Sequence, residues 1–168
     1  PVYSVTLFHH RPWRELDGAR IAVTTDSATS VELLRVLLAH EGMDAELVPR
    51  PPDLEAMLAD HDAALLIGDA ALTEGIARRE VGGTVPRMTD LGEAWYRHTR
   101  LPFTFAVWAS PIDRRPSDRL VAKLRAAREH GLGHLADVAG DAAVRVGISP
   151  AAMLRYLANF RYHLGPPD

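Results

Sequence analysis

The sequence predicts an α/β fold, with a parallel-rich sheet flanked by helices and followed by a C-terminal helical segment. Short apolar segments of strand length alternate with helical segments in the first half of the chain, which is typical of a parallel sheet with crossover helices. The segment at 63–67 is apolar throughout, as in a strand buried on both faces. From Ser117 onward the periodic segments have helical spacing.

The composition is that of a globular protein, and it argues against some classes of binding partner. Of the 168 residues, 47% are hydrophobic and 24% are charged, so a packed core is expected. The formal net charge is −3 and the arginines are scattered, so we expect no nucleic-acid partner. No apolar run approaches the ~20 residues that span a bilayer, so we expect no membrane partner. Cysteine is absent, which excludes disulfides and thiolate ligands.

Short polar residues mark the expected helix starts, because their side chains accept a first-turn N–H group. Thr29 with Glu32 fits a capping box, and Asp90 with Glu93 fits another. The other expected starts are Asp53, the Gly68-Asp69 break, Ser117 and Ser149, the last followed by Pro150 at the first helical position. Strands are expected at 4–8, 21–24, 45–48, 63–67 and 103–109. The chain begins directly at the first of these strands, so we expect it to be a piece of a longer polypeptide.

The loop from Thr24 to Ser30 is the first candidate binding site. It follows a strand at the end where open α/β sheets bind ligands, and it opens a helix whose N–H groups and dipole favour an anion. A carboxylate or phosphate would suit this loop. The candidate binding residues are Ser27, Ala28, Thr29 and Ser30. The alternative is that Thr29 only caps the helix while the other hydroxyls face water.

The second candidate is the stretch Gly68-Asp69-Ala70, which also follows a strand. Gly68 allows a tight turn, and Asp69 could orient a hydroxyl group or accept a proton. The alternative is that Asp69 is merely the N-cap of the next helix.

The remaining motifs are weaker indications of function. Among eight histidines none lies in an HExxH arrangement, and we expect no metal site. His9 and His10 lie near the expected hinge and could be functional, but we expect a surface pair. Trp95 and Trp108 could line a cleft, but we expect a core role for both. Dinucleotide, Walker and serine-hydrolase motifs are absent from the sequence.

Three segments together resemble the chorismate dehydratase family of the futalosine route to menaquinone. The first is Leu7-Phe8 leading to Ile21-Ala22-Val23-Thr24 with Ser27-Ala28-Thr29-Ser30-Val31. The second is Leu66-Ile67-Gly68-Asp69-Ala70-Ala71-Leu72. The third is Asp90-Leu91-Gly92-Glu93-Ala94-Trp95, followed by the segment 101–109. Their order and spacing match over nearly the whole chain.

The resemblance implies a fold like that of type II periplasmic binding proteins, with two α/β lobes joined by two strands. Residues 1–8 would be a hinge strand, 9–102 the ligand-binding lobe and 103–110 the return hinge strand. Residues 111–168 would be helices that pack on the other lobe, most of which is missing here. The cleft between the lobes would hold the active site, so the catalytic base is expected in the missing part.

The implied reaction is loss of water from chorismate, giving 3-[(1-carboxyvinyl)oxy]benzoate, in the cytoplasm and without a cofactor or metal. Of the substrate's two carboxylates, one would bind at Ser27, Ala28, Thr29 and Ser30, with Gly68 and Ala70 nearby. Asp69 would be the catalytic residue that holds or polarises the departing hydroxyl group.

Other functions are compatible with the sequence. A non-catalytic substrate-binding protein for a small carboxylate would have the same fold. The sister enzyme, 1,4-dihydroxy-6-naphthoate synthase, also shares it, although the segment 67–72 favours the dehydratase. The effector domain of a transcription regulator is the weakest alternative, because the C-terminal helices lack a basic face.

Overall fold

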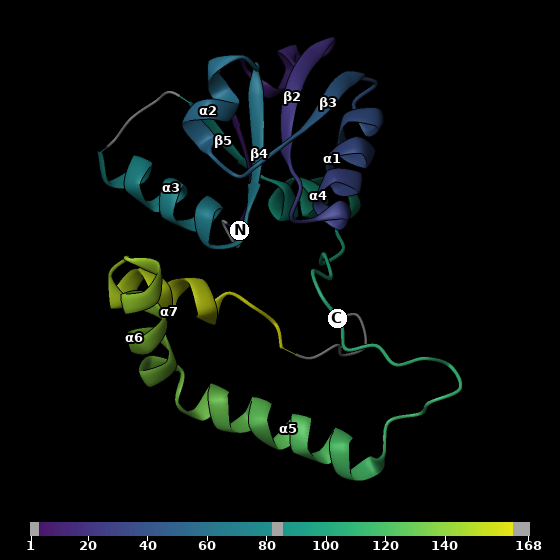
Figure 1. Ribbon diagram of the computed structural model, residues 1–168, viewed down its shortest axis with the longest axis vertical. Coiled ribbons are helices and arrows are strands. Elements are labelled where there is room, and N and C mark those ends of the chain that lie inside the picture. The colour runs from purple at the N-terminus through teal and green to yellow at the C-terminus, as the bar shows by residue number, and fades with distance from the viewer. Residues whose placement is uncertain (1–3, 82–85, 163–168) are drawn as a thin grey trace. The chain divides into compact units, whose positions relative to one another are not determined.

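The centre of residues 1–103 is a mixed sheet, seen in the computed structural model of residues 4–81 and 86–162 (Figure 1). Within these described residues it has five strands, in the order β3-β2-β4-β1-β5. They are β1 (Val5–His9), β2 (Ala19–Thr24), β3 (Ala45–Arg50), β4 (Ala63–Ile67) and β5 (Arg87–Asp90). The strands β3, β2 and β4 run parallel, whereas β1 is antiparallel to both β4 and β5. This confirms the expected parallel-rich sheet.

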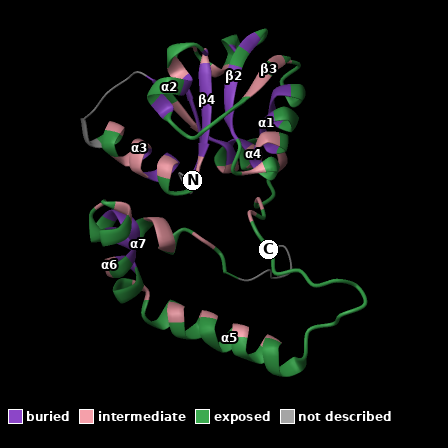
Figure 2. Ribbon diagram, viewed as in Figure 1, coloured by how far each residue is buried: buried purple, intermediate pink, exposed green. Residues whose placement is uncertain are grey.

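Helices cover both faces of the sheet. They are α1 (Ala28–His40), α2 (Leu54–Ala59), α3 (Gly68–Val81) and α4 (Leu91–Thr99), with a short 3-10 helix, η1 (Trp13–Glu15). On the face of α2 and α3, Phe8 and Leu66 pack with Met57 and Ala71 in one apolar cluster (Figure 2). The other face packs against α1 and α4, and the strand residues Leu7, Ile21 and Leu65 are fully buried. Burial on both faces explains why β4 is apolar throughout.

Four helix starts confirm the expected caps, and one differs. Asp53, Asp90, Ser117 and Ser149 each cap the helix that follows. The first helix, α1, is capped by Ser27 instead of Thr29, and it begins at Ala28. Ser27 has the extended backbone that an N-cap requires, with φ −151° and ψ 107°. Both Ser27 and Thr29 carry a hydroxyl group that could cap the helix, and the structure uses Ser27.

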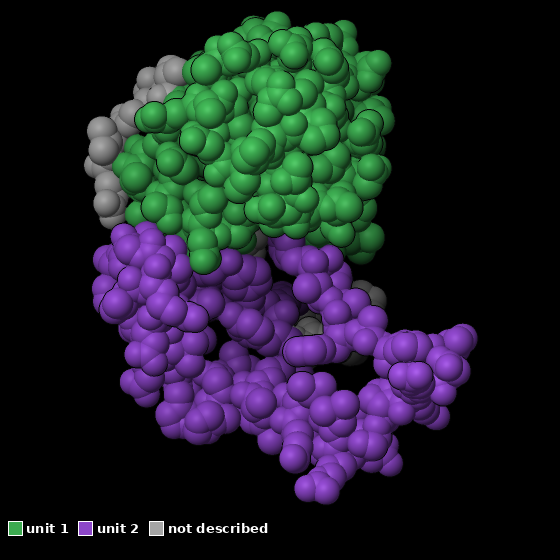
Figure 3. All heavy atoms as spheres, in the orientation of Figure 1, with its two compact units in different colours: residues 1–103 green, residues 104–168 purple. Residues whose placement is uncertain are grey.

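Residues 104–168 form a second compact unit (Figure 3). Its described helices are α5 (Asp118–Gly133), α6 (Leu135–Val146) and α7 (Pro150–Ala158), which confirms the expected helical segment. Ala139 and Ala143 of α6 are buried, as is Met153 of α7. In contrast, α5 has no buried residue (Figure 2).

The expected strand at 103–109 is not formed. These residues have no regular secondary structure, and none of the described strands pairs with them. A strand needs a neighbour to accept and donate its backbone hydrogen bonds, so an apolar, β-branched composition is not sufficient. Between this segment and the helices of the second unit lies an apolar hollow of about 700 Å³, lined mainly by α5 and the start of α6.

Candidate active site

The strand directions bring both candidate loops to one edge of the sheet. The strands β2, β3, β4 and β5 all run in the same sense, so the segments that follow them emerge at the same edge. The start of β1 lies there too, because the N–H of Gly68 donates to the carbonyl of Ser4 at 2.8 Å. We call this edge the carboxyl edge. It comprises residues 4–6, 24–30, 50–53, 68–71 and 90–93.

At the first candidate loop, Ser27 begins α1. Its hydroxyl oxygen accepts the N–H of Ser30 at 3.2 Å, and its O–H donates to the hydroxyl of Ser30 at 3.0 Å. The first N–H groups of a helix have no acceptor within the helix. The amides of Ala28 and Thr29 therefore remain as donors, and both residues are exposed. Such a helix start suits an anion.

The second candidate loop is a direct passage from β4 into α3. Gly68 has φ +62°, a left-handed conformation that glycine adopts without strain. Asp69 is exposed in the first turn of α3 and does not precede the helix, so it is not an N-cap. Ala70 is half-buried and its methyl group packs on the core cluster. Ala70 could therefore contact a ligand only through its backbone.

Buried polar side chains gather at the carboxyl edge. The described residues include seven buried polar or charged ones, of which five lie at this edge: Ser4, Thr6, Thr24, Ser30 and Asp90. Asp90 is only 7% exposed; it is the register partner of Thr6, and it caps α4 by accepting the N–H of Glu93 at 2.8 Å. Burial of polar groups is costly unless they are hydrogen-bonded, and here Thr24 accepts the N–H of Asp26 at 3.2 Å while Ser30 is bonded to Ser27.

Sequence reasoning did not assign Ser4, Thr6 or Asp90 to the site. The available signal was a hydroxyl residue inside an otherwise apolar strand, as in the run from Ser4 to Phe8. The sequence alone does not show at which edge of the sheet these hydroxyl groups lie. The antiparallel direction of β1 decides this, because it places Ser4 beside Gly68.

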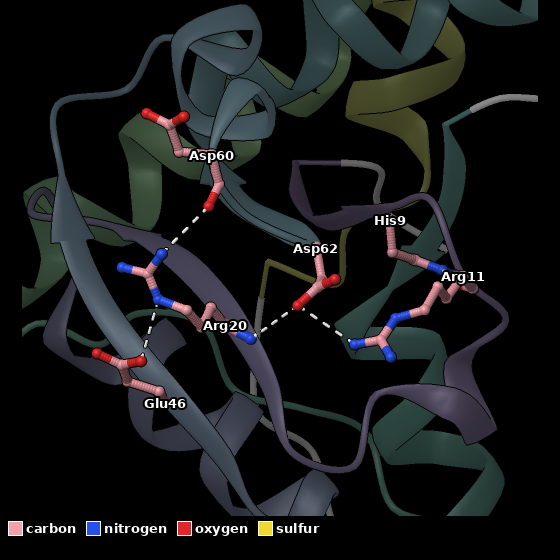
Figure 4. A network of polar contacts seen from close by, with 6 residues as sticks. All are labelled: His9, Arg11, Arg20, Glu46, Asp60 and Asp62. Atoms are coloured by element: carbon pink, nitrogen blue, oxygen red, sulfur yellow. Dashed lines mark hydrogen bonds and ion pairs between the residues drawn. The ribbon is translucent and has the colours of Figure 1, made fainter.

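The opposite edge of the sheet holds a separate polar network (Figure 4). Asp62 accepts the backbone N–H of Arg20 at 2.9 Å and pairs with Arg11 at 3.2 Å. Arg20 also pairs with Glu46 at 3.1 Å. These contacts connect Arg20, at the start of β2, to Glu46 on β3 and to Asp62 just before β4. They lie at the opposite ends of the strands from the candidate loops.

His9 belongs to this opposite edge and corrects the expected surface pair. His10 is exposed, but His9 is only 3% exposed. Its Nδ1–H donates to the carbonyl of Arg11 at 2.6 Å, and its Nε2 lies 2.9 Å from the hydroxyl of Thr89 on β5. Burial lowers the pKa of His9, and the nearby Arg87 and His10 act in the same direction, against the hydrogen bond to Arg11.

The two tryptophans also differ from each other. Trp95 is half-buried on α4, with its ring edge-to-face against Phe103 at 5.6 Å between centroids. Trp108 is 88% exposed, so the expected core role is wrong for it. Within the described residues, no group of three His, Asp or Glu side chains is placed to share a metal ion.

The sequence is similar to that of known proteins. A family model described as menaquinone biosynthesis matches residues 1–168. The chain belongs to this family. A member from Thermus thermophilus, named chorismate dehydratase, is 42% identical over 99% of this chain and 64% of that protein. The chain therefore spans less than two thirds of the length of this relative.

A solved structure supports the fold independently. The periplasmic aliphatic sulphonate binding protein SsuA from Escherichia coli superposes with a TM-score of 0.53 at 15% identity. The match covers 94% of this chain and 55% of that one. The menaquinone biosynthesis family member described here thus has a periplasmic-binding-protein-like fold. In its described part, no helix is long and apolar enough to cross a membrane.

Proposed function

We propose that this chain carries the ligand-binding lobe of a chorismate dehydratase, a hydro-lyase of menaquinone biosynthesis. The observation that carries the proposal is the meeting of two candidate loops at the carboxyl edge, in a chain 42% identical to a protein of that name. The amides of Ala28 and Thr29 would bind one carboxylate of chorismate. Ser27 and Ser30 would hold those amides in place, with Gly68 and Ala70 beside the ligand.

The proposed reaction breaks two bonds between the substrate ring and its substituents, C3–H and C4–O. A base removes the proton from C3, the electron pair forms the new ring double bond, the C4–O bond breaks, and the departing hydroxyl group takes up a proton to leave as water. The product, 3-[(1-carboxyvinyl)oxy]benzoate, is aromatic, so the reaction is driven by the substrate itself and needs no redox cofactor. The protein must position the ring and stabilise the departing oxygen.

Asp69 is the proposed catalytic residue for that departure. Its carboxyl group is exposed at the carboxyl edge, and α3 does not use it as a cap. A side chain free of a capping role can contact a substrate hydroxyl group, either holding it or transferring a proton to it. We place the base that removes the C3 proton outside these 168 residues.

We further propose that residues 1–8 and 103–110 become hinge strands in the full-length protein and that residues 111–168 pack there on a second lobe. The support is the segment 103–109, which pairs with none of the described strands, and the amphipathic helix α5, which buries none of its residues. Residues 9–102 would then be the ligand-binding lobe, and closure of the two lobes would exclude water from the ligand. The proposed compartment is the cytoplasm, which agrees with the absence of cysteine.

The test is turnover by the full-length protein, meaning these residues together with the remaining length that the relative has. Incubation with chorismate should yield an aromatic product that absorbs in the ultraviolet and has the mass of chorismate minus one water. Tight binding of chorismate without product would instead favour a substrate-binding protein. Formation of 1,4-dihydroxy-6-naphthoate from its own precursor, with no reaction of chorismate, would favour the sister enzyme.

A further inference from the structure

We propose that Arg50 binds the second carboxylate of the substrate and so selects dicarboxylates over monocarboxylates. This inference rests on the function proposed above, and it adds a specificity-determining residue to the proposed site.

The strand register places Arg50 beside the first candidate loop. Arg50 is the last residue of β3 and the register partner of Thr24, the last residue of β2. Neighbouring strands lie roughly 4.8 Å apart, and the chain passes from Thr24 to Ser27 and the start of α1 within three residues. A ligand with one carboxylate on α1 is therefore within reach of a long side chain that starts at the end of β3.

The backbone of Arg50 is held from both sides. On one side it belongs to the ladder between β2 and β3. On the other, Pro51 and Pro52 restrict the chain, and Asp53 caps α2 by accepting the N–H of Ala56 at 3.0 Å. The position from which the Arg50 side chain extends is therefore fixed, although the exposed side chain itself is ordered only when a ligand binds.

The charge balance of the carboxyl edge gives Arg50 its significance. Within the five segments of this edge Arg50 is the one cationic side chain, and the acidic ones are Asp26, Asp53, Asp69, Asp90 and Glu93. A ligand with two carboxylates would be repelled by this edge unless a cation faced one of them. At this edge the dipole of α1 favours one of the two carboxylates, and Arg50 is the cation that can face the other.

The guanidinium group of Arg50 retains donors for a ligand. One terminal N–H donates to the carbonyl of Pro49 at 3.0 Å, and within the described part of the chain Arg50 forms no ion pair. By contrast, Arg11, Arg20, Arg35 and Arg78 each pair with a carboxylate. Arginine presents its N–H groups in a planar fork that matches a carboxylate.

The experiment measures steady-state kinetics of the full-length protein with chorismate and with each of its two monomethyl esters. We expect Arg50→Gln to raise the KM for chorismate roughly 10- to 100-fold, the worth of a charged hydrogen bond, with kcat changed by less. The KM of Arg50→Lys for chorismate should lie between the KM of the wild type and that of Arg50→Gln. With the ester that lacks the carboxylate facing Arg50, wild type and Arg50→Gln should have the same KM. Arg35→Gln, an exposed position on α1, is the matched control and should behave as wild type.

The outcomes separate this inference from the proposed function. If the wild type dehydrates chorismate and both Arg50 variants keep the wild-type KM, Arg50 has no role while the function stands. If both esters remain equally sensitive to Arg50→Gln, the residue acts through the fold and not through one carboxylate. If the wild type neither binds nor dehydrates chorismate, the proposed function fails and this inference fails with it. Circular dichroism of each variant verifies folding, and Arg50→Lys provides the test if Arg50→Gln does not fold.

Discussion

Ser27 and Ser30 are joined by two hydrogen bonds at the start of α1, one through the amide of Ser30 and one between the two hydroxyl groups. This pair fulfils the capping role inside the protein and leaves the preceding amides, those of Ala28 and Thr29, for a ligand. Stability and binding therefore depend on different atoms of one loop. Substitutions can separate the two roles.

Ser27→Ala should lower the free energy of unfolding by about 1 kcal/mol, because it removes the side-chain acceptor of the cap. Ser27→Asn retains an acceptor and should keep most of that stability. Denaturant unfolding of the three proteins measures the difference. Thr29→Ala should leave stability nearly unchanged, since Thr29 does not cap. A larger loss with Thr29→Ala than with Ser27→Ala would contradict the structure.

Asp69→Asn should lower kcat for chorismate by about 100-fold or more in the full-length protein, the usual contribution of a proton-transferring side chain. Folding should be nearly unaffected, because Asp69 is exposed and does not cap α3. Asp118→Asn is the matched control, since Asp118 is likewise an exposed acid in the first turn of a helix, α5. Equal kcat values for Asp69→Asn and wild type would remove Asp69 from the mechanism.

His9 should make stability fall as the solution becomes acidic. Its pKa is lowered in the folded protein, chiefly by burial, so the unfolded chain binds more protons below the ordinary value of 6.5. The stabilisation is complete above pH 6.5 and is lost as the pH falls from there towards the lowered pKa of the folded state. His9→Asn should flatten this part of the profile of unfolding free energy against pH.

The control for this prediction is His130→Asn, because His130 is an exposed residue of α5. Its profile should follow that of the wild type. Arg87→Gln removes one of the charges that lower the pKa of His9. It should therefore narrow the pH range over which the protein loses stability on acidification. An unchanged profile for His9→Asn would show that His9 does not titrate within this range.

Leu124→Asn should destabilise the full-length protein more than the 168-residue chain alone. Leu124 lines the apolar hollow of the second unit, and α5 buries no residue there. A covering lobe would bury the side chain, and its loss would then cost about 1–3 kcal/mol of unfolding free energy. Lys123→Asn, on the neighbouring position, should have little effect in either protein. Equal effects of Leu124→Asn in both proteins would argue against a covering lobe.

Local signals in the sequence predicted much of this fold. The caps at Asp53, Asp90, Ser117 and Ser149 depend on a side chain and an amide three residues apart, so short sequence windows contain them. The strands β2 and β4 are apolar because both of their faces are covered.

The features that the sequence did not reveal depend on contacts between distant residues. The strand β5 is short and polar at Arg87, Thr89 and Asp90, so its pairing with β1 gives it strand structure. Burial of His9 follows from the position of β1 between two strands. The segment 103–109 has the composition of a strand but lacks a neighbour among the described strands. The same argument applies to Arg50, whose relation to Thr24 appears only once β2 and β3 are paired.

The place of β1 in the sheet has a consequence for synthesis of the protein. It pairs with β4 and β5, whose residues follow it by more than fifty positions. During translation β1 therefore lacks these two neighbours until both have emerged from the ribosome. Such distant pairing slows folding and prolongs the exposure of an apolar strand, so chaperone capture should act on β1 until β5 has been synthesised.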